Sequence, residues 1–302
     1  MNLPAAEKYE ILVIGGGAAG MAVSLAACRK GRKVLLAEHD AELGGILNQC
    51  VHKGFGHGIF REDLTGQEYA ARFIPEIVNS GIEVRTGTAV LSLDKDRTAL
   101  LSGPEGLYRV AFEQCVLAAG CRERTCESLG IAGTRPAGVF TAGTAQQLIN
   151  RGGYGIGTRI VILGSGDIGQ IMARQFAQAG LQVAAMVEQM DHPGGLERNR
   201  KECLEAFHIP VILRTTVDEI LGTKRICGVM ARDLETGRRY EIACDTLVTA
   251  VGLIPDRILC RGLAADNGQL PAWLHLCGNC ESVHDIVDSV TREAYELGNR
   301  IA

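Results

Sequence analysis

A glycine-rich hexapeptide, Gly15-Gly16-Gly17-Ala18-Ala19-Gly20, recurs 149 residues later as Gly164-Ser165-Gly166-Asp167-Ile168-Gly169. The match extends past the hexapeptides, because Gly31 recurs as Gly180 at the same spacing. The chain therefore contains an internal repeat. Since each copy fits the GxGxxG fingerprint of dinucleotide-binding folds, the repeat predicts two bound dinucleotides.

The sequence around each hexapeptide favours a strand, a tight turn and a helix. Apolar, β-branched runs of strand length, residues 10–14 and 159–163, come directly before the glycines, and a helical segment follows each. In such a unit the first glycine forms the turn, the second lets the backbone approach a pyrophosphate, and the third lets the helix pack against the strand. The pyrophosphate would lie at the helix N-terminus, whose free N–H groups suit an anion.

A second predicted strand in each copy ends in a carboxylate, Glu38 in the first and Glu188 in the second. Either side chain can accept hydrogen bonds from the ribose hydroxyls of an adenosine. Glu38 lies four residues after Val34, whereas Glu188 lies five after Val183. A β-bulge or a longer strand in the second copy would absorb the extra residue. A single fingerprint is often only a helix-packing turn, but two copies in the same context favour nucleotide binding.

Composition places the chain among globular α/β proteins. With 302 residues it is long enough for two domains, and its 46% hydrophobic residues and 38 glycines are typical of strands buried on both faces. The net charge of −4 offers no basic stripe for nucleic acid. No apolar stretch reaches the roughly 20 residues of a membrane span, and residues 1–8 lack a signal-sequence pattern. We expect a cytoplasmic protein whose eleven cysteines stay reduced.

Two similar apolar strands, residues 115–120 and 246–252, bracket the second repeat. This order predicts that one domain is inserted into another. A closing helix is expected to start near Ser282, with no room after it for a third, dimer-forming domain. The predicted first domain consists of residues 1–122 and 250–302, and the second of residues 123–249.

Three motifs outside the fingerprints, residues 42–50, 120–125 and 283–288, resemble one branch of the pyridine nucleotide-disulphide oxidoreductases. Small members of this superfamily, such as thioredoxin reductase, insert an NAD(P) domain into an FAD domain, and the resemblance covers nearly the whole chain. The branch is a flavin subunit associated with a partner flavoprotein of the glycerol-3-phosphate dehydrogenase type. Subunits of opine oxidases and hydrogen cyanide synthase are more distant relatives. The resemblance implies an α/β fold of two Rossmann-like domains, the NAD domain inserted in the FAD domain.

The resemblance also assigns roles to individual positions. Gly278-Asn279 matches a Gly-Asp pair that contacts the ribityl and phosphate part of FAD, and asparagine keeps an acceptor there while removing a charge. The helix that follows would point its N-terminus at the flavin. The implied FAD-binding residues are Gly15, Gly17, Ala18, Ala19, Gly20, Glu38, Gly44, Gly45, Gly120, Gly278 and Asn279. The implied NAD-binding residues are Gly164, Gly166, Asp167, Ile168, Gly169, Glu188 and Gly252.

The redox cysteine pair of the superfamily is absent from its usual places, because no CxxC lies in residues 120–251 and Cys50 stands alone in the early loop. The chain's one CxxC, Cys277 to Cys280, surrounds the Gly-Asn pair already assigned to FAD. We therefore favour a packing role for these two thiols over a redox role. Without a second CxxC we expect no metal site.

The loop that holds Cys50 and His52 should reach the flavin, and it also contains His57. A general acid or base in this loop is conceivable, so Cys50 and His52 are weak candidates for catalysis, as are Cys277 and Cys280. Hydride transfer from a nicotinamide to a flavin needs no acid–base residue of its own. Residues 261–275 look shorter than the hairpin that usually precedes the Gly-Asp pair, which would leave the flavin's rim open to a partner protein.

We expect an FAD-dependent oxidoreductase that passes a hydride between NAD(H) and bound FAD and exchanges electrons with a partner dehydrogenase subunit. Glu188 and the lack of Arg or Lys at residues 189–192 favour NADH over NADPH, although Arg198 and Arg200 follow. Two alternatives stay open: a stand-alone NAD(P)H-dependent reductase of a disulphide, dioxygen or a quinone, and a non-catalytic dinucleotide-binding accessory subunit. The intact second fingerprint argues against the accessory subunit.

Overall fold

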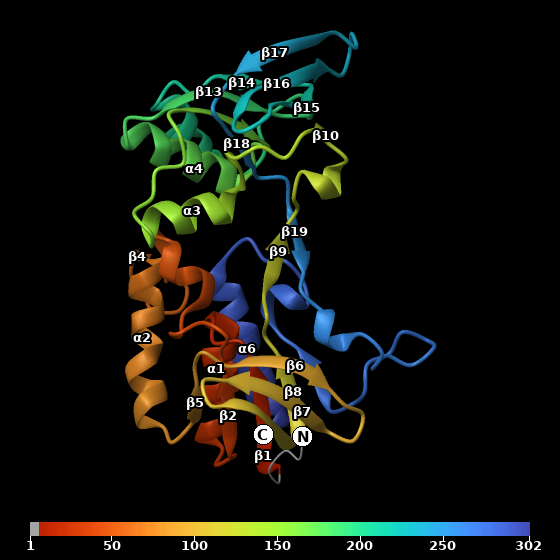
Figure 1. Cartoon of the computed structure of the whole chain (residues 1–302). Coiled ribbons are helices and arrows are strands. Elements are labelled where there is room, and N and C mark those ends of the chain that lie inside the picture. Colours follow the sequence, from red (N-terminus) through yellow and green to blue (C-terminus); the bar gives the residue numbers. More distant parts are fainter. Residues whose placement is uncertain (1–5) are drawn as a thin grey trace. The chain divides into compact units, whose positions relative to one another are not determined.

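The computed structural model describes residues 6–302, which form two compact units (Figure 1). Unit 1 combines the N-terminal part of the chain up to Arg122 with Ile254–Ala302, and unit 2 is Glu123–Leu253. The chain passes between the units along β9 (Cys121–Glu123) and β19 (Leu253–Pro255), which pair with each other. Unit 2 is thus inserted into unit 1 in the sequence.

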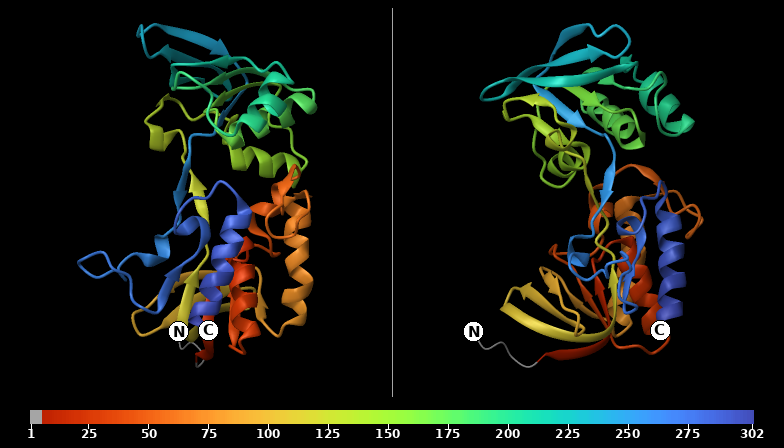
Figure 2. Two further views of the ribbon diagram at one scale, coloured as in Figure 1. Left: turned by 180° about the vertical axis from the view of Figure 1, so that it is seen from behind. Right: turned by 90° about the vertical axis from the view of Figure 1, so that its right-hand side faces the viewer.

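Unit 1 contains one mixed sheet, whose parallel part is covered by helices on one face, while its antiparallel part, a meander, covers the other face (Figure 2). The strand order is β5-β2-β1-β8-β7-β6, and β20 pairs with β8. The strands are β1 (Glu7–Ile14), β2 (Val34–Ala37), β5 (Glu83–Arg85), β6 (Ala89–Leu93), β7 (Thr98–Gly103), β8 (Gly106–Leu117) and β20 (Leu274–Leu276). The helices are α1 (Ala18–Arg29), α2 (Gly66–Asn79) and α6 (Val287–Ile301), and the short elements are η1 (Gly45–Gln49), β3 (Lys53–Phe55), β4 (Leu64–Thr65), η4 (Ile258–Cys260) and η5 (Gly278–Cys280).

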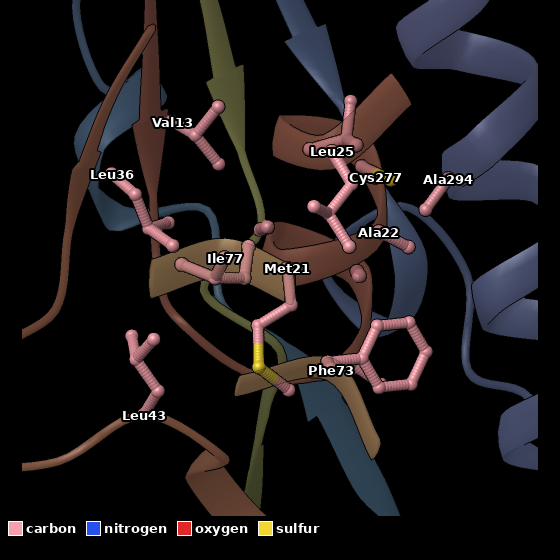
Figure 3. Close-up of a cluster of buried hydrophobic side chains, with 14 of the residues drawn as sticks. Val13, Met21, Ala22, Leu25, Leu36, Leu43, Phe73, Ile77, Cys277 and Ala294 are labelled. Atoms are coloured by element: carbon pink, nitrogen blue, oxygen red, sulfur yellow. The ribbon is translucent and has the colours of Figure 1, made fainter. Parts of the chain in front are cut away.

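Alternation along β1 accounts for the two layers of unit 1. Ile11 and Val13 belong to the cluster beneath the helices, whereas Leu12 and Ile14 belong to the cluster beneath the meander. Successive side chains of a strand point to opposite faces of the sheet, so a strand that is apolar at every position is buried on both. The expected burial on both faces is confirmed. Figure 3 shows the helix-side cluster, in which Cys277 is one of the packed side chains.

Unit 2 repeats this plan with a parallel sheet of order β11-β18-β12-β13-β14 and an antiparallel sheet of order β10-β15-β16-β17. The parallel strands are β11 (Val139–Thr141), β12 (Arg159–Leu163), β13 (Gln182–Val187), β14 (Val211–Ile212) and β18 (Thr246–Thr249). The antiparallel sheet adds β15 (Thr215–Gly222), β16 (Ile226–Asp233) and β17 (Arg239–Ala243), with β10 (Ala132–Gly133) parallel to β15. The helices are α3 (Ala142–Asn150), α4 (Asp167–Gln178) and α5 (Glu197–Asn199), followed by the π-helix η3 (Arg200–Glu205), with η2 (Glu127–Leu129) near the start of the unit.

The extra residue before Glu188 lies in a β-bulge. β12 pairs with β13 through Ile160 and Val183, but the next pair is Val161 and Ala185, so Ala184 has no partner of its own. The bulge adds one residue to β13 relative to β2, whose pairing with β1 is regular. The bulge expected from the spacing of Glu188 is confirmed.

The closing helix begins at Val287, so the expected start near Ser282 was wrong. The amide of His284 donates to the side-chain oxygen of Asn279 at 3.0 Å, and Ile286 has an extended backbone, with φ −130° and ψ 127°. Both features keep residues 282–286 out of a helix. Among residues 6–302, no helix is long and apolar enough to cross a lipid bilayer.

Candidate functional site

The first and third glycines of each fingerprint are required by close backbone contacts. Gly15 has φ +104°, and a Cβ on it would lie 2.5 Å from the carbonyl oxygen of Ala118. A Cβ on Gly20 would lie 1.7 Å from the carbonyl oxygen of Gly15, where α1 packs against the turn. In unit 2, Gly164 has φ +98°, and a Cβ on Gly169 would lie 2.5 Å from the carbonyl oxygen of Gly164. The tight turn and the close packing expected of these glycines are both present.

The second glycine of each fingerprint faces open space. Gly17 is the N-cap of α1 and Gly166 the N-cap of α4, and a Cβ on either would meet no described atom within 4 Å. Neither helix start has a side-chain cap among the described residues. The first N–H groups of a helix have no partner within it, so both turns present unpaired donors and a positive dipole end to an anion. A dinucleotide pyrophosphate fits this chemistry.

The two carboxylates behind these turns are buried and bonded in the same way. In unit 1, Glu38 accepts the amide of Gly16 at 2.6 Å with one oxygen and that of Asp40 at 2.8 Å with the other. In unit 2, Glu188 accepts the amide of Ser165 at 2.9 Å and that of Met190, also at 2.9 Å. One oxygen of each carboxylate has a further partner: that of Glu188 also accepts the hydroxyl of Ser165, and that of Glu38 lies 2.8 Å from Nδ1 of His39. The other oxygen of each keeps a second lone pair. Both carboxylates therefore support their turn and keep capacity for a sugar hydroxyl.

The structure brings the other candidate FAD residues to the first turn. The amide of Gly44 donates to the carbonyl oxygen of Gly16 at 2.9 Å, and a Cβ on Gly45 would lie 3.3 Å from the Cα of Gly17. From the far end of the sequence, a Cβ on Gly278 would lie 2.9 Å from the Cβ of Ala19 in α1. Three glycine motifs separated in sequence thus meet at one helix N-terminus.

Asn279 is held by side chains of unit 1. Its amide nitrogen donates to the sulfur of Cys121 at 3.8 Å, and its oxygen accepts the amide of His284. The ring of His284 lies 3.3 Å from the same oxygen through Nδ1 and 2.9 Å from the carboxylate of Glu293 through Nε2. The orientation of the asparagine amide is therefore set within the protein.

The remaining candidate positions lie at the edges of the two sites. Gly120, with φ +72°, follows β8, and its oxygen accepts the amide of Asp256 at 3.0 Å. Gly252, with φ +103°, follows β18, and its oxygen accepts the amide of Arg124 at 3.1 Å. Ala18 and Ala19 are buried at the start of α1, whereas Ile168 at the start of α4 is half exposed.

The three weak cysteine candidates are buried thiols. Cys50 donates to the oxygen of Ile46 at 3.3 Å, and burial raises its pKa to about 12. Burial raises the pKa of Cys277 to about 12 and also raises that of Cys280, which donates to the oxygen of Leu117 at 2.8 Å. A nucleophilic or redox thiol needs its thiolate. This environment suits packing.

The two loop histidines have polar partners. His52 contacts the carbonyl oxygen of Lys53 at 2.9 Å and its ring lies against Phe55, while His57 pairs with Asp63 at 3.1 Å. Sequence analysis did not identify two polar side chains of the second site, Ser165 and Gln170. The internal repeat aligns them with Gly16 and Met21, neither of which has a polar side chain.

Comparison with known proteins places most of the chain in one family. The family model described as pyridine nucleotide-disulphide oxidoreductase matches residues 9–288. A thioredoxin reductase of Treponema pallidum is 23% identical over 247 residues, which are 82% of this chain and 77% of the relative. Hydrogen cyanide synthase subunit HcnB of Pseudomonas protegens is 30% identical over 59% of this chain, and sarcosine oxidase subunit alpha of Rhizobium meliloti is 28% identical over 87%. The matched regions cover only 38% and 26% of these two longer subunits.

A similar fold occurs in the crystal structure of Lactococcus lactis thioredoxin reductase. The two chains align with a TM-score of 0.78 over 97% of each, at 18% sequence identity. The fold expected from the sequence, α/β with two dinucleotide-binding domains, is confirmed.

Proposed function

This chain belongs to the pyridine nucleotide-disulphide oxidoreductase family, and we propose that it is an NADH-dependent flavin subunit whose electrons leave to a partner dehydrogenase subunit. Family membership makes it an FAD- and NAD(P)-dependent oxidoreductase. The observation that carries the proposal is the pair of turns at Gly17 and Gly166, each with an uncapped helix N-terminus and a buried glutamate behind it. When bound, the two cofactors supply hydride transfer between nicotinamide and flavin.

Unit 1 is the proposed FAD site and unit 2 the proposed NADH site. In unit 1, Gly44, Gly45 and Gly278 lie against the fingerprint turn and the start of α1. The α1 N-terminus would hold the FAD pyrophosphate and Glu38 the adenosine ribose. In unit 2 the α4 N-terminus and Glu188 would do the same for NADH.

Charges around Glu188 support NADH over NADPH. Asp191 directly follows Met190, whose amide Glu188 accepts, and it pairs with His192 at 2.6 Å. The arginines that follow are ion-paired with carboxylates of the chain. Arg198 pairs with Glu202 at 2.9 Å. Arg200 pairs with Glu197 and Glu205, and Arg214 pairs with Asp191 and Glu235. The 2′-phosphate of NADPH would lie near the buried carboxylate of Glu188, and the neighbouring arginines that could bind it are already paired with other carboxylates.

The buried thiols favour an external electron acceptor. A disulphide reductase needs an accessible dithiol beside the flavin, whereas Cys277 and Cys280 are 2% and 0% exposed. Two relatives of this chain are subunits, of hydrogen cyanide synthase and of sarcosine oxidase. Both observations support transfer to a partner flavoprotein. The alternative is a stand-alone reductase of a small disulphide, dioxygen or a quinone. The two functions differ in which electron acceptor reoxidises the flavin fastest.

The test compares electron acceptors after reduction by NADH. We expect the chain, purified with one noncovalent FAD, to reduce small disulphides and quinones slowly and to transfer electrons at least tenfold faster to the flavoprotein that co-purifies with it from its native source. The measurement is the rate of flavin reoxidation in a stopped-flow spectrophotometer. Fast reoxidation by a disulphide without any partner would overturn the subunit proposal and leave the stand-alone reductase in its place.

A further inference from the structure

The internal repeat extends to a loop that closes on each fingerprint turn. In unit 1, a Cβ on Gly45 would lie 3.3 Å from the Cα of Gly17 and 3.7 Å from its nitrogen. In unit 2, a Cβ on Gly194 would lie 3.7 Å from the Cα and nitrogen of Gly166. Gly45 and Gly194 are 149 residues apart, the same spacing as the fingerprints. A loop after the second strand therefore lies against the phosphate-binding glycine in both units.

The two loops are anchored by different forces. Leu47 follows Gly45 and is 2% exposed in the helix-side core, whereas its repeat counterpart Leu196 is 53% exposed. Opening the loop of unit 1 would bring buried apolar surface into water, which is unfavourable. Opening the loop of unit 2 would expose little more of Leu196 than water already reaches.

Hydrogen bonds hold the loop of unit 2 instead. The hydroxyl of Ser165 accepts the amide of Gly194 at 2.9 Å, and the side-chain nitrogen of Gln170 donates to the oxygen of Gly194 at 2.6 Å. One carboxylate oxygen of Asp167 accepts the amide of Leu196 at 2.7 Å and the side-chain nitrogen of Asn199 at 2.6 Å.

These three fingerprint side chains have no polar counterparts in unit 1. Their repeat positions there are Gly16, Ala18 and Met21. Gln170 is fully buried, and its side-chain oxygen has no hydrogen-bond partner among the described residues. An unpaired buried acceptor is costly, and an apolar residue such as methionine would avoid that cost. Gln170 is therefore placed for the bonds that its nitrogen makes to the oxygen of Gly194 in the loop and to that of Ser165 in the turn.

We propose that Ser165, Asp167 and Gln170 form a polar latch that holds residues 193–199 against the second fingerprint and sets the rate at which the nicotinamide dinucleotide enters and leaves. Hydrogen bonds exchange readily with water, because folding only replaces protein–water bonds with protein–protein bonds. A latch of this kind suits a nucleotide that must exchange in every turnover. The apolar anchor of unit 1 suits a cofactor that stays. The inference rests on the proposed NADH site in unit 2.

Asn199 allows the latch to be weakened outside the fingerprint. Asn199→Ala removes one bond to Asp167, and Asn199→Asp sets two carboxylates against each other. Asn150→Ala is the matched control, because it removes a side-chain amide that bonds Gln175 elsewhere in unit 2. Two quantities are measured on the FAD-loaded chain: hydrogen exchange of the Gly194 and Leu196 amides without nucleotide, and the dissociation rate of NAD⁺ by surface plasmon resonance. NAD⁺ is the probe because it binds without reducing the flavin.

We expect Asn199→Ala to speed both amide exchange and NAD⁺ release about tenfold, the change expected for one hydrogen bond to a charged acceptor. Asn199→Asp should speed both further. Asn150→Ala should leave both rates at the wild-type values, and all variants should retain FAD as the wild type does. Faster amide exchange with unchanged NAD⁺ release overturns the latch, as does no change in either quantity. A wild-type chain that binds no NAD⁺ overturns the proposed function itself and the latch with it.

Discussion

Glu38 and Glu188 each serve the fold and the proposed site through the same atoms. One oxygen fixes the middle residue of the fingerprint turn, and the other fixes an amide two residues further along the chain. A carboxylate is suited to this double role because it accepts bonds at both oxygens and keeps a lone pair on one of them for a ligand. The two positions are therefore constrained by turn geometry as well as by the nucleotide.

The charge of Glu188 is predicted to set the preference between nicotinamide nucleotides. Glu188→Gln keeps an acceptor for the turn and removes the charge that would repel a 2′-phosphate. We expect the ratio of flavin reduction rates with NADH and NADPH to fall at least tenfold, measured by anaerobic stopped flow. Glu241→Gln, at an exposed position on β17, is the control. Faster reduction by NADPH in the wild type, or a ratio unmoved by Glu188→Gln, counts against this role.

Single residues were predictable where local geometry dictates them. A glycine that must adopt φ +104°, as Gly15 does, or that touches a neighbouring carbonyl, as Gly20 does, follows from the fingerprint alone. Ser165 and Gln170 did not follow from it, because their partners in residues 193–199 are brought near only by the folded loop. The offset of 149 residues, which pairs them with Gly16 and Met21, is the signal that could have identified them.

At the scale of elements, the loop after β13 is one residue shorter than its counterpart in unit 1, which offsets the residue that the bulge in β13 adds. The bulge at Ala184 adds a residue before Glu188, but Gly194 follows Glu188 by six residues, whereas Gly45 follows Glu38 by seven. The loop glycine therefore returns to the same place against the turn. Spacing in the sequence indicated one extra residue, in a β-bulge or a longer strand, and the structure shows the bulge. The start of α6 was not predictable, because it depends on the bond between Asn279 and His284.

The turn η5 that carries the CxxC is predicted to be chemically inert. Because burial raises the pKa of Cys277 to about 12, its thiolate fraction at pH 8 is about one part in ten thousand, and the thiolate becomes abundant only as the pH rises toward 12. We expect iodoacetamide at pH 8 to alkylate the exposed Cys227 and to leave Cys50, Cys277 and Cys280 unmodified, as measured by peptide mass spectrometry.

Unfolding in guanidinium chloride is the control for this experiment, since all eleven thiols should then react. Alkylation of Cys277 or Cys280 in the native chain at the rate of Cys227 would contradict the packing role, as would a disulphide between them. The apolar sequence around Cys227 favours a buried thiol in a strand, but the structure shows this thiol exposed. Cys227 lies in β16, but its side chain alternates to the exposed face.

At the scale of the whole molecule, two units of one architecture have diverged in how they close over their turns. The inserted order of the units and the fold class were readable from the sequence, because the repeat, its strands and its glycines follow local rules. The electron acceptor could not be predicted from the sequence, because a surface that binds a partner protein has no motif with a fixed spacing of residues. The resemblance to flavoprotein subunits supplies that part of the proposal.

We propose that this chain carries a single two-electron centre that NADH reduces. The most direct test is an anaerobic titration of the FAD-loaded chain with NADH, following flavin absorbance. We predict complete bleaching by about one NADH per chain, unchanged when Cys277 and Cys280 are both replaced by serine. Consumption of about two NADH per chain, falling to one in that double variant, would contradict the claim by revealing a redox-active dithiol. Failure of NADH to bleach the flavin at all would contradict it as well.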